Sequence, residues 1–254
     1  MRIGLISDIH EDLTNLHKAL SKLEKECDEI VCLGDITGFT PDFYPFTPDA
    51  NECIRLVREN CKTVVVGNHD LFSVQRLPRY IKSFEFPSNW YSLSLDEQRK
   101  IAGKKIWLYE NEKLPELNDL NRKWLEMLPE HKMEEMSGRK LLFSHFFYPN
   151  LSGSETLKKF TFKAVSDHHS YMSALGADNA FCGHTHSEGV LKAARSANGL
   201  RHVMRMPLAF SAFNKKVKVT SNDFFTIPAV ARSNRESGYV VYDLNEQIIT
   251  AYKL

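Results

Sequence analysis

The stretch "VVVGNHDLF", residues 64–72, runs three valines directly into a glycine, an amide, an imidazole and a carboxylate. A run of valines is typical of a buried strand, and Gly67-Asn68 is a favourable turn dipeptide. A turn alone, however, gives no reason for His69 and Asp70 to follow. The alternative is that a strand presents reactive side chains at its carboxyl end, and the remaining strands of the chain decide between the two.

Two apolar segments earlier in the sequence end in the same way. The predicted strand 2–7 leads to Asp8 and His10, and the predicted strand 29–34 leads to Asp35. Leucines at helical spacing predict a helix over 12–26, with Asp12 as its N-cap, and 48–60 is a second amphipathic helix. Continuously apolar strands separated by helices predict a parallel sheet that is covered on both faces.

The second half of the chain repeats the pattern. Residues 132–145 are predicted to form a hairpin that turns at Ser137-Gly138 and ends at His145, and the strand 179–183 is followed by His184 and His186. Ligands of open parallel sheets bind outside the carboxyl ends of the strands, so we expect these polar groups to converge. Five strands that each finish in Asp, Asn or His are not explained by a single turn.

Other parts of the chain carry weaker patterns. Helices are predicted near 118–128 and within 154–173, and on the second of these His168 and His169 are expected to lie on a solvated face. The segment 71–135 is otherwise hard to interpret. Neither an internal repeat nor a clear linker is present, so a single domain over 1–254 is predicted. Antiparallel strands are expected in the last quarter, at 201–206, 215–221, 238–244 and 247–254.

Composition excludes several classes of protein. Lys plus Arg is 33 and Asp plus Glu is 32, so a net charge of +1 gives no general attraction to nucleic acid or to an anionic membrane. No apolar run approaches the ~18 residues of a membrane span, and the N-terminus does not resemble a signal peptide. The five cysteines form no Cys-x-x-Cys pair, which favours a reducing compartment and a cytoplasmic location.

The polar groups at the strand ends are typical metal ligands. Carboxylates, an amide oxygen and imidazoles, without thiolates, suit one or two divalent first-row metals. The number of candidates favours two, since they are too many for one tetrahedral or octahedral site. The candidate ligands are Asp8, His10, Asp35, Asn68, His145, His184 and His186.

The order of these motifs resembles that of the calcineurin-like metallophosphoesterase superfamily, and in particular its small stand-alone prokaryotic phosphodiesterases. The resemblance implies an α/β fold in which two mixed β-sheets pack together as a sandwich between flanking helices, giving four layers. It rests on Asp8-x-His10, Gly34-Asp35, Gly67-Asn68-His69-Asp70, His145 and Gly183-His184-x-His186.

The resemblance also implies roles for the residues. One metal would be held by Asp8, His10 and His186, and the other by Asn68, His145 and His184. Asp35 would bridge the two, and a bridging hydroxide would be the nucleophile. His69 would be the general acid for the leaving group, and Asp70 would orient it.

The implied activity is hydrolysis of a phosphodiester or phosphomonoester, with a small phosphate ester or a nucleotide as substrate. A nuclease or nucleotide phosphatase with the same site is an alternative, and a non-catalytic scaffold that binds proteins is another. Mn²⁺, Fe, Zn²⁺ and Ni²⁺ all accept these ligands. The aromatic and proline-rich segment 36–50 is expected to line the substrate pocket.

Overall fold

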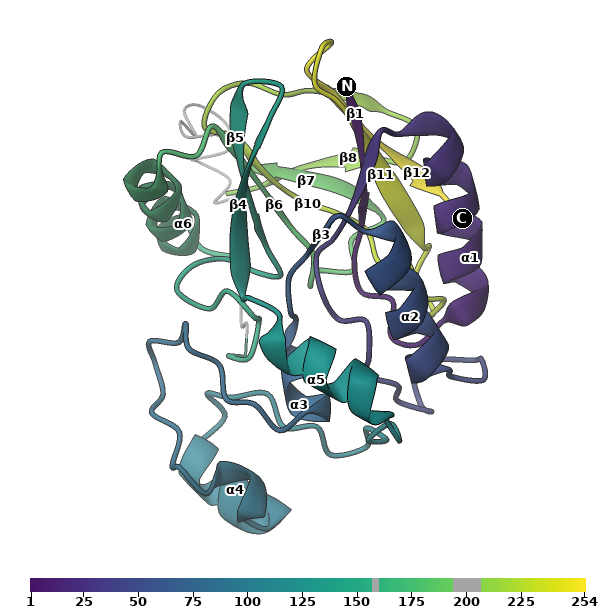
Figure 1. The fold of residues 1–254 in the computed structure, drawn as a ribbon. Coiled ribbons are helices and arrows are strands. Elements are labelled where there is room, and N and C mark those ends of the chain that lie inside the picture. The colour runs from purple at the N-terminus through teal and green to yellow at the C-terminus, as the bar shows by residue number, and fades with distance from the viewer. Residues whose placement is uncertain (157–159, 194–206) are drawn as a thin grey trace.

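A computed structural model describes residues 1–156, 160–193 and 207–254 (Figure 1). It contains two mixed sheets, as predicted, and each has six strands among the described residues. The first sheet has the order β3-β2-β1-β11-β12-β9. Its strands are β1 (Arg2–Ile6), β2 (Glu29–Cys32), β3 (Thr63–Val64), β9 (Lys216–Lys218), β11 (Gly238–Asp243) and β12 (Ile248–Lys253).

The second sheet has the order β4-β5-β6-β10-β7-β8, with β5, β6 and β10 running parallel to one another. In the first sheet, likewise, β1, β2 and β3 are parallel and the remaining pairs are antiparallel. The strands of the second sheet are β4 (His131–Met136), β5 (Arg139–Ser144), β6 (Asn179–Cys182), β7 (Gly189–Ala193), β8 (Ala209–Ala212) and β10 (Phe224–Thr226).

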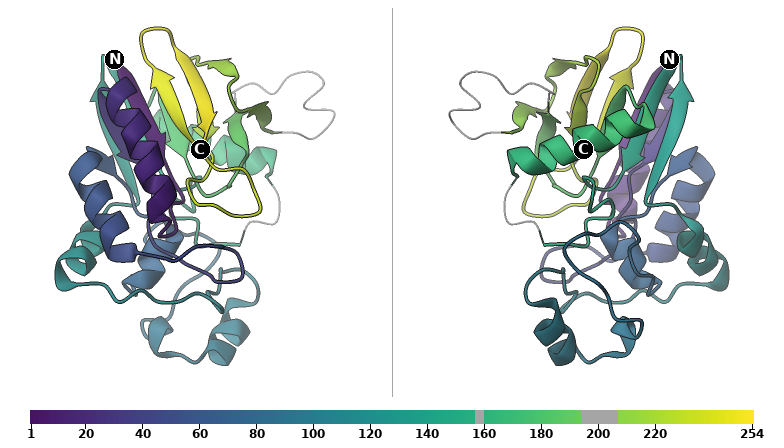
Figure 2. Two further views of the ribbon diagram at one scale, coloured as in Figure 1. Left: turned by 90° about the vertical axis from the view of Figure 1, so that its right-hand side faces the viewer. Right: turned by 90° about the vertical axis from the view of Figure 1, so that its left-hand side faces the viewer.

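Helices cover the outer faces of both sheets. Figure 2 shows α1 on one side of the molecule and α6 on the opposite side. Asp12 caps α1 by accepting a hydrogen bond from the backbone of Asn15, as the sequence predicts. The helical segments are α1 (Leu13–Glu26), α2 (Ala50–Asn60), α3 (Asn68–Ser73), η1 (Trp90–Ser92), α4 (Leu95–Ala102), α5 (Asp119–Met127) and α6 (Phe162–Leu175).

The alternation of side chains along β1 explains the layers. Ile3 and Leu5 face the second sheet and pack in one core with Phe143 and Phe181, whereas Ile6 packs on the opposite face in the core that α1 and α2 cover. A strand that is buried on both faces must be apolar at every position, which is why the predicted strands lack a polar side. The four-layer α/β prediction is confirmed.

Several boundaries differ from the prediction. The strand predicted at the valine run 64–66 begins at Thr63 and pairs in the sheet only at Thr63–Val64, because the backbone of Val66 turns away and donates to the carbonyl of Pro129. The strand expected at 201–206 lies outside the described residues. None of the helices in the described ranges is both long and apolar enough to span a membrane.

The prediction for His168 and His169 is wrong. Both side chains are buried, at 0% and 8% exposure, and they pack edge-on against Phe224 of the second sheet. They belong to the apolar face of α6, which continues through Val165 and Met172 at helical spacing. The polarity of the two histidines favours solvent exposure, but their spacing from Val165 and Met172 indicates the buried face of the helix.

Burial makes His168 an acid-sensitive position, because it lowers the pKa of the imidazole to about 3. Below the usual histidine pKa of about 6.5, His168 is protonated in the unfolded chain but stays neutral in the folded chain. The free energy of unfolding therefore falls as the pH falls. We expect this group alone to remove about 1–2 kcal/mol of unfolding free energy between pH 6.5 and pH 5. Urea unfolding followed by circular dichroism at both pH values measures the loss.

The variant His168→Asn, which keeps an acceptor for the backbone N–H of Tyr148, should lose correspondingly less stability over that interval. His17→Asn, at an exposed position on α1, is the matched control and should behave as the wild type. Equal acid sensitivity in all three proteins would contradict the assignment.

Candidate metal centre

The structure brings the candidate ligands to one edge of the two sheets. Asp8 and His10 follow β1, Asp35 follows β2, and Asn68 begins α3, which is separated from β3 by residues 65–67. The other three histidines come after β5 and β6 of the second sheet, at positions 145, 184 and 186. Two groups of three side chains result, and in each group the potential ligand atoms lie within 4.8 Å of one another.

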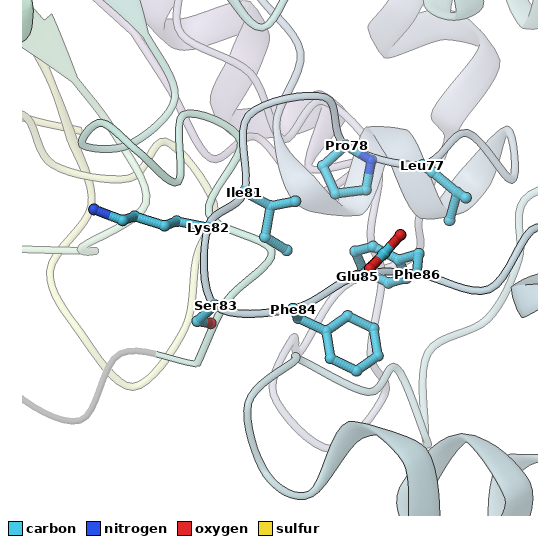
Figure 3. Close-up of a pocket in the computed structure, with 8 residues that line it drawn as sticks. All are labelled: Leu77, Pro78, Ile81, Lys82, Ser83, Phe84, Glu85 and Phe86. Carbon is cyan, nitrogen blue, oxygen red and sulfur yellow. The ribbon is translucent and has the colours of Figure 1, made fainter.

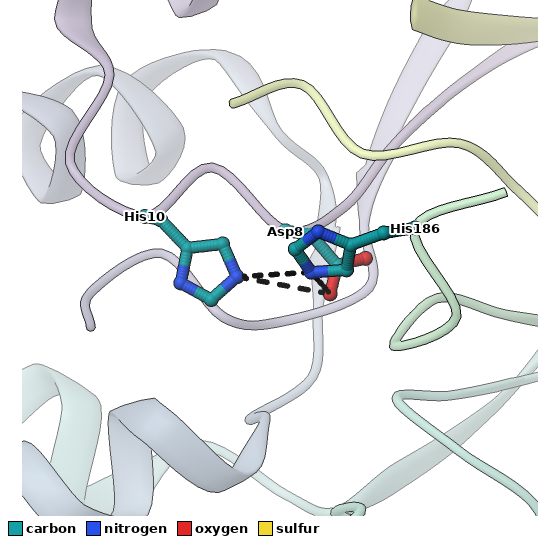
Figure 4. A group of neighbouring side chains, drawn as sticks. All are labelled: Asp8, His10 and His186. Atoms are coloured by element: carbon teal, nitrogen blue, oxygen red, sulfur yellow. Dashed lines mark hydrogen bonds and ion pairs between the residues drawn. The ribbon is translucent and has the colours of Figure 1, made fainter. Parts of the chain in front are cut away.

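The first group consists of Asp8, His10 and His186 (Figure 4). The Nε2 atom of His186 lies 3.1 Å from Oδ1 of Asp8 and 3.2 Å from Nε2 of His10. Asp8 and His10 are buried, while the side chain of His186 is 25% exposed. The group is therefore closed on one side and open to ligands on the other.

The second group consists of Asp35, His145 and His184. The Nε2 atom of His145 lies 2.9 Å from Oδ2 of Asp35 and 3.2 Å from Nδ1 of His184. It is also 3.9 Å from Oδ1 of Asp8, so the two groups are neighbours. The predicted bridging residue, Asp35, falls in this second group.

Asn68 stands beside the second group. Its Oδ1 atom is buried and has no hydrogen-bond partner among the described residues. A Cβ atom added to Gly153 would lie 3.0 Å from this oxygen and 2.6 Å from Nδ1 of His184, so both atoms face the same small space. A buried carbonyl oxygen without a donor is costly, and a bound cation would satisfy it.

Hydrogen bonds fix the orientation of two of the imidazoles. His10 Nδ1 lies 3.0 Å from the carbonyl of Gly38, and His145 Nδ1 lies 2.7 Å from the carbonyl of Leu33. Donation from Nδ1 to these carbonyls leaves Nε2 as the nitrogen that points into the centre, which is the usual arrangement for histidines that bind metals.

The backbone is strained at most of the candidate ligands. Left-handed φ values are rare outside glycine and cost about 1–2 kcal/mol each. Such strain is tolerated where the surrounding structure enforces a functional geometry. The residues concerned are Asp8 (φ 54°), His10 (45°), Asp35 (53°), His184 (65°) and His186 (45°).

Electrostatics favour ionised carboxylates in the centre. Burial disfavours the charge on Asp8, but the neighbouring His186, His145 and His10 hold its pKa well below the usual range. The same balance, dominated by His145, lowers the pKa of Asp35. These residues therefore fit divalent cations: two carboxylates, four imidazoles and an orphaned amide oxygen converge without a thiolate.

His69 lies against this centre. Its backbone N–H donates to Oδ1 of Asp35 at 2.9 Å, and its ring stands edge-on to His10 with centroids 4.9 Å apart. Its Nδ1 atom pairs with Oε2 of Glu112 at 2.5 Å. Burial opposes the imidazolium, but Glu112 and Asp35 outweigh it and raise the pKa of His69 to about 9.

Asp70 differs from its predicted role. Its carboxylate accepts hydrogen bonds from the backbone N–H groups of Ile36, Thr37 and Gly67, at 2.8, 2.9 and 3.0 Å. It thereby ties the turn after Asp35 to the start of α3, and Glu112 takes the place beside His69. Glu112 was missed because it lies in a segment without a recognisable motif, and nothing in its sequence context points to His69.

The segment 36–50 packs on the centre. The ring of Tyr44 stacks on His10 with centroids 5.0 Å apart, and Phe39, Tyr44 and Ala231 form a small apolar cluster. Ala231 itself donates its N–H to the carbonyl of Asp8. These contacts place the segment next to the first group of ligands.

A different hollow lies away from the centre. About 520 Å³ in volume, it is lined by residues 77–78 and 81–86, including Ile81, Phe84 and Phe86 (Figure 3). None of its lining residues is a candidate ligand. The hollow borders the small apolar core around Trp90, which supports the projecting α4 region seen in Figure 1.

Solved structures share this fold. A metallophosphoesterase from Sphaerobacter thermophilus superimposes with a TM-score of 0.67 at 20% identity, over 100% of this chain and 88% of that one. A hypothetical protein from Pyrococcus horikoshii gives a TM-score of 0.57 at 13% identity, over 100% and 87% of the two chains.

Sequence comparison adds a curated relative, an uncharacterized protein of Methanocaldococcus jannaschii. It is 30% identical over 145 residues, which are 56% of this chain and 48% of the relative. The match thus spans about half the length of that relative. The family model for calcineurin-like phosphoesterases matches residues 1–188, a range that contains every candidate ligand. The chain belongs to the calcineurin-like phosphoesterase family.

Proposed function

We propose that this protein is a dimetal phosphoesterase that hydrolyses a phosphodiester or a phosphomonoester. The observation that carries the proposal is the closeness of the two groups of candidate ligands. In the second group, His145 Nε2 lies 2.9 Å from Asp35, and the same atom lies 3.9 Å from Asp8 of the first group. Two cations held by these neighbouring groups would suit displacement at phosphorus, where both the entering and the leaving oxygen need stabilisation.

Asp8, His10 and His186 would hold one ion, and Asn68, His145 and His184 the other, with Asp35 between them. Mn²⁺, Fe, Zn²⁺ and Ni²⁺ are all compatible with this donor set. When bound, such a pair supplies an activated water at neutral pH and neutralises charge on the phosphoryl oxygens.

The chain's own contribution to the leaving group is His69. With Nδ1 engaged by Glu112, the Nε2 atom is the nitrogen available to a substrate. We propose that it donates a proton to the departing oxygen, which general acid catalysis requires when the alcohol is a poor leaving group. Asp70 supports this arrangement indirectly, since it fixes the turns that carry Asp35 and His69.

A nuclease or a nucleotide-specific phosphatase would use the same residues, and only substrates distinguish these possibilities. The non-catalytic scaffold that binds proteins is the weaker alternative. The sequence retains all seven candidate ligands and His69, which supports catalysis, because a scaffold has no need of them.

Chelation tests the proposal directly. We expect the protein with added Mn²⁺ to hydrolyse bis-p-nitrophenyl phosphate or p-nitrophenyl phosphate, and to lose this activity after incubation with a chelator. Release of p-nitrophenol is followed by absorbance, and re-addition of Mn²⁺ should restore it. The preferred reagent separates a diesterase from a monoesterase.

Metal content measured on the same samples makes each outcome informative. Two ions per chain without turnover of either reagent would indicate a narrow natural substrate. The absence of both bound metal and turnover would contradict the dimetal phosphoesterase and favour the scaffold.

A further inference from the structure

A short segment from outside the predicted strands and ligand motifs lies across the centre. Trp107 donates its backbone N–H to the carbonyl of Ser154, in the loop that carries Gly153. Six residues later, Lys113 donates to the carbonyl of Phe39, in the segment 36–50. Residues 107–113 are thus anchored at both ends to loops that border the candidate ligands.

Glu112, within this segment, has a buried carboxylate that pairs with His69. Its side chain is 2% exposed, and Oε2 lies 2.5 Å from Nδ1 of His69. The other oxygen has no hydrogen-bond partner among the described residues. Burying a carboxylate is costly, and the pair with His69 is the contact that offsets this cost. The contact holds the imidazole with Nδ1 protonated and Nε2 turned away from Glu112.

Tyr109, in the same segment, controls the amide of Asn68. Its hydroxyl lies 3.1 Å from the backbone carbonyl oxygen of Asn68. Because this oxygen can only accept, the hydroxyl donates its proton to it. The hydroxyl oxygen can then only accept, and it takes a hydrogen bond from Nδ2 of Asn68 at 3.2 Å. Oδ1 of Asn68 is therefore the atom left to face His184. Stacking on Phe72, with centroids 4.2 Å apart, keeps the Tyr109 ring in place.

We propose that Tyr109 and Glu112 are positioning residues: Tyr109 fixes which atom of Asn68 faces the metal centre, and Glu112 fixes which nitrogen of His69 faces the substrate. The two hydrogen-bonded pairs stand independently of catalysis. Their effect on turnover rests on the proposed phosphoesterase function.

The test of Glu112 is Glu112→Gln, with Glu110→Gln as the matched control. Glu110 lies two residues away in the same segment, but it is exposed and pairs with Arg99. Nitrogen-15 NMR of the histidine side chains reports whether the Nδ1 proton of His69 is held by a carboxylate. We expect this resonance to shift in Glu112→Gln and to stay unchanged in Glu110→Gln.

The turnover rates of two esters with different leaving groups should also show whether Glu112 positions His69. We expect Glu112→Gln to lower kcat about 10–100-fold for a phenyl phosphate ester, whose leaving group needs a proton, and far less for the p-nitrophenyl ester. A merely structural defect would lower both rates equally. An unshifted His69 resonance, or equal losses on the two esters, would overturn the role of Glu112.

The test of Tyr109 is Tyr109→Phe, which keeps the ring and removes the hydroxyl. We expect the affinity for one of the two Mn²⁺ ions to fall about 10–100-fold in a calorimetric titration. Tyr91→Phe is the control, because Tyr91 belongs to the same region and its hydroxyl donates to the carbonyl of Arg76, away from the candidate ligands. Unchanged Mn²⁺ affinity in Tyr109→Phe would overturn its role.

The two hypotheses fail in distinguishable ways. If the NMR shift and the loss of Mn²⁺ affinity occur but no ester is hydrolysed by the wild type, the positioning roles stand and the proposed function fails. If the wild type hydrolyses esters and the variants match it in every measurement, the function stands and the positioning roles fail.

Discussion

Replacing Asp35 by asparagine is expected to lower phosphoester hydrolysis about 1,000-fold or more and to reduce the metal content of the protein. Oδ2 of Asp35 lies 2.9 Å from His145, and Oδ1 receives the backbone N–H of His69. Asparagine removes the negative charge and turns one of these oxygens into a donor. The loss of several kcal/mol of charge stabilisation corresponds to a rate effect of this size.

Steady-state rates and metal analysis by mass spectrometry measure the two effects together. Asp96→Asn is the control, since that carboxylate is 80% exposed on α4 and pairs only with Arg99 among the described residues. Full activity with two metals bound in Asp35→Asn would show that Asp35 does not lie between the ions.

The strand ends were predictable because their signal is local. An apolar run that stops at Asp8, Asp35 or His145 is visible in a few consecutive residues, and the geometry of parallel strands supplies the convergence. The pairing of strands β1, β2 and β3 in one sheet, and of β5 and β6 in the other, then follows from the same pattern.

Contacts between distant segments left no such signal. Glu112 is 43 positions from its partner His69, and Tyr109 is 41 positions from Asn68. Neither residue stands in a periodic segment, so nothing in the sequence indicates which loop packs on the centre. Asp70 is the converse case: its position next to His69 suggested contact, but the start of α3 directs the two side chains to different partners.

The second large effect is expected for Gly153→Ala. This glycine has a φ of +85°, and an added Cβ would lie 2.6 Å from Nδ1 of His184 and 3.0 Å from Oδ1 of Asn68. Both atoms are candidate ligands of the second metal, and a methyl group between them must push at least one aside. Since a displacement of about 1 Å costs about 100-fold in rate, we expect a loss of that order together with loss of one Mn²⁺ per chain.

Backbone strain alone must be separated from this clash, because alanine in a left-handed conformation costs about 1–2 kcal/mol wherever it occurs. Gly176→Ala provides the comparison: Gly176 ends α6 with a φ of +70°, and an added Cβ there meets no atom within 4 Å. Both variants should lose stability in urea unfolding, Gly153→Ala more because of the clash, whereas only Gly153→Ala should lose metal and activity. If Gly176→Ala lost as much Mn²⁺ as Gly153→Ala, the effect would come from global destabilisation. If neither variant lost any, Asn68 and His184 would not share a metal at this position.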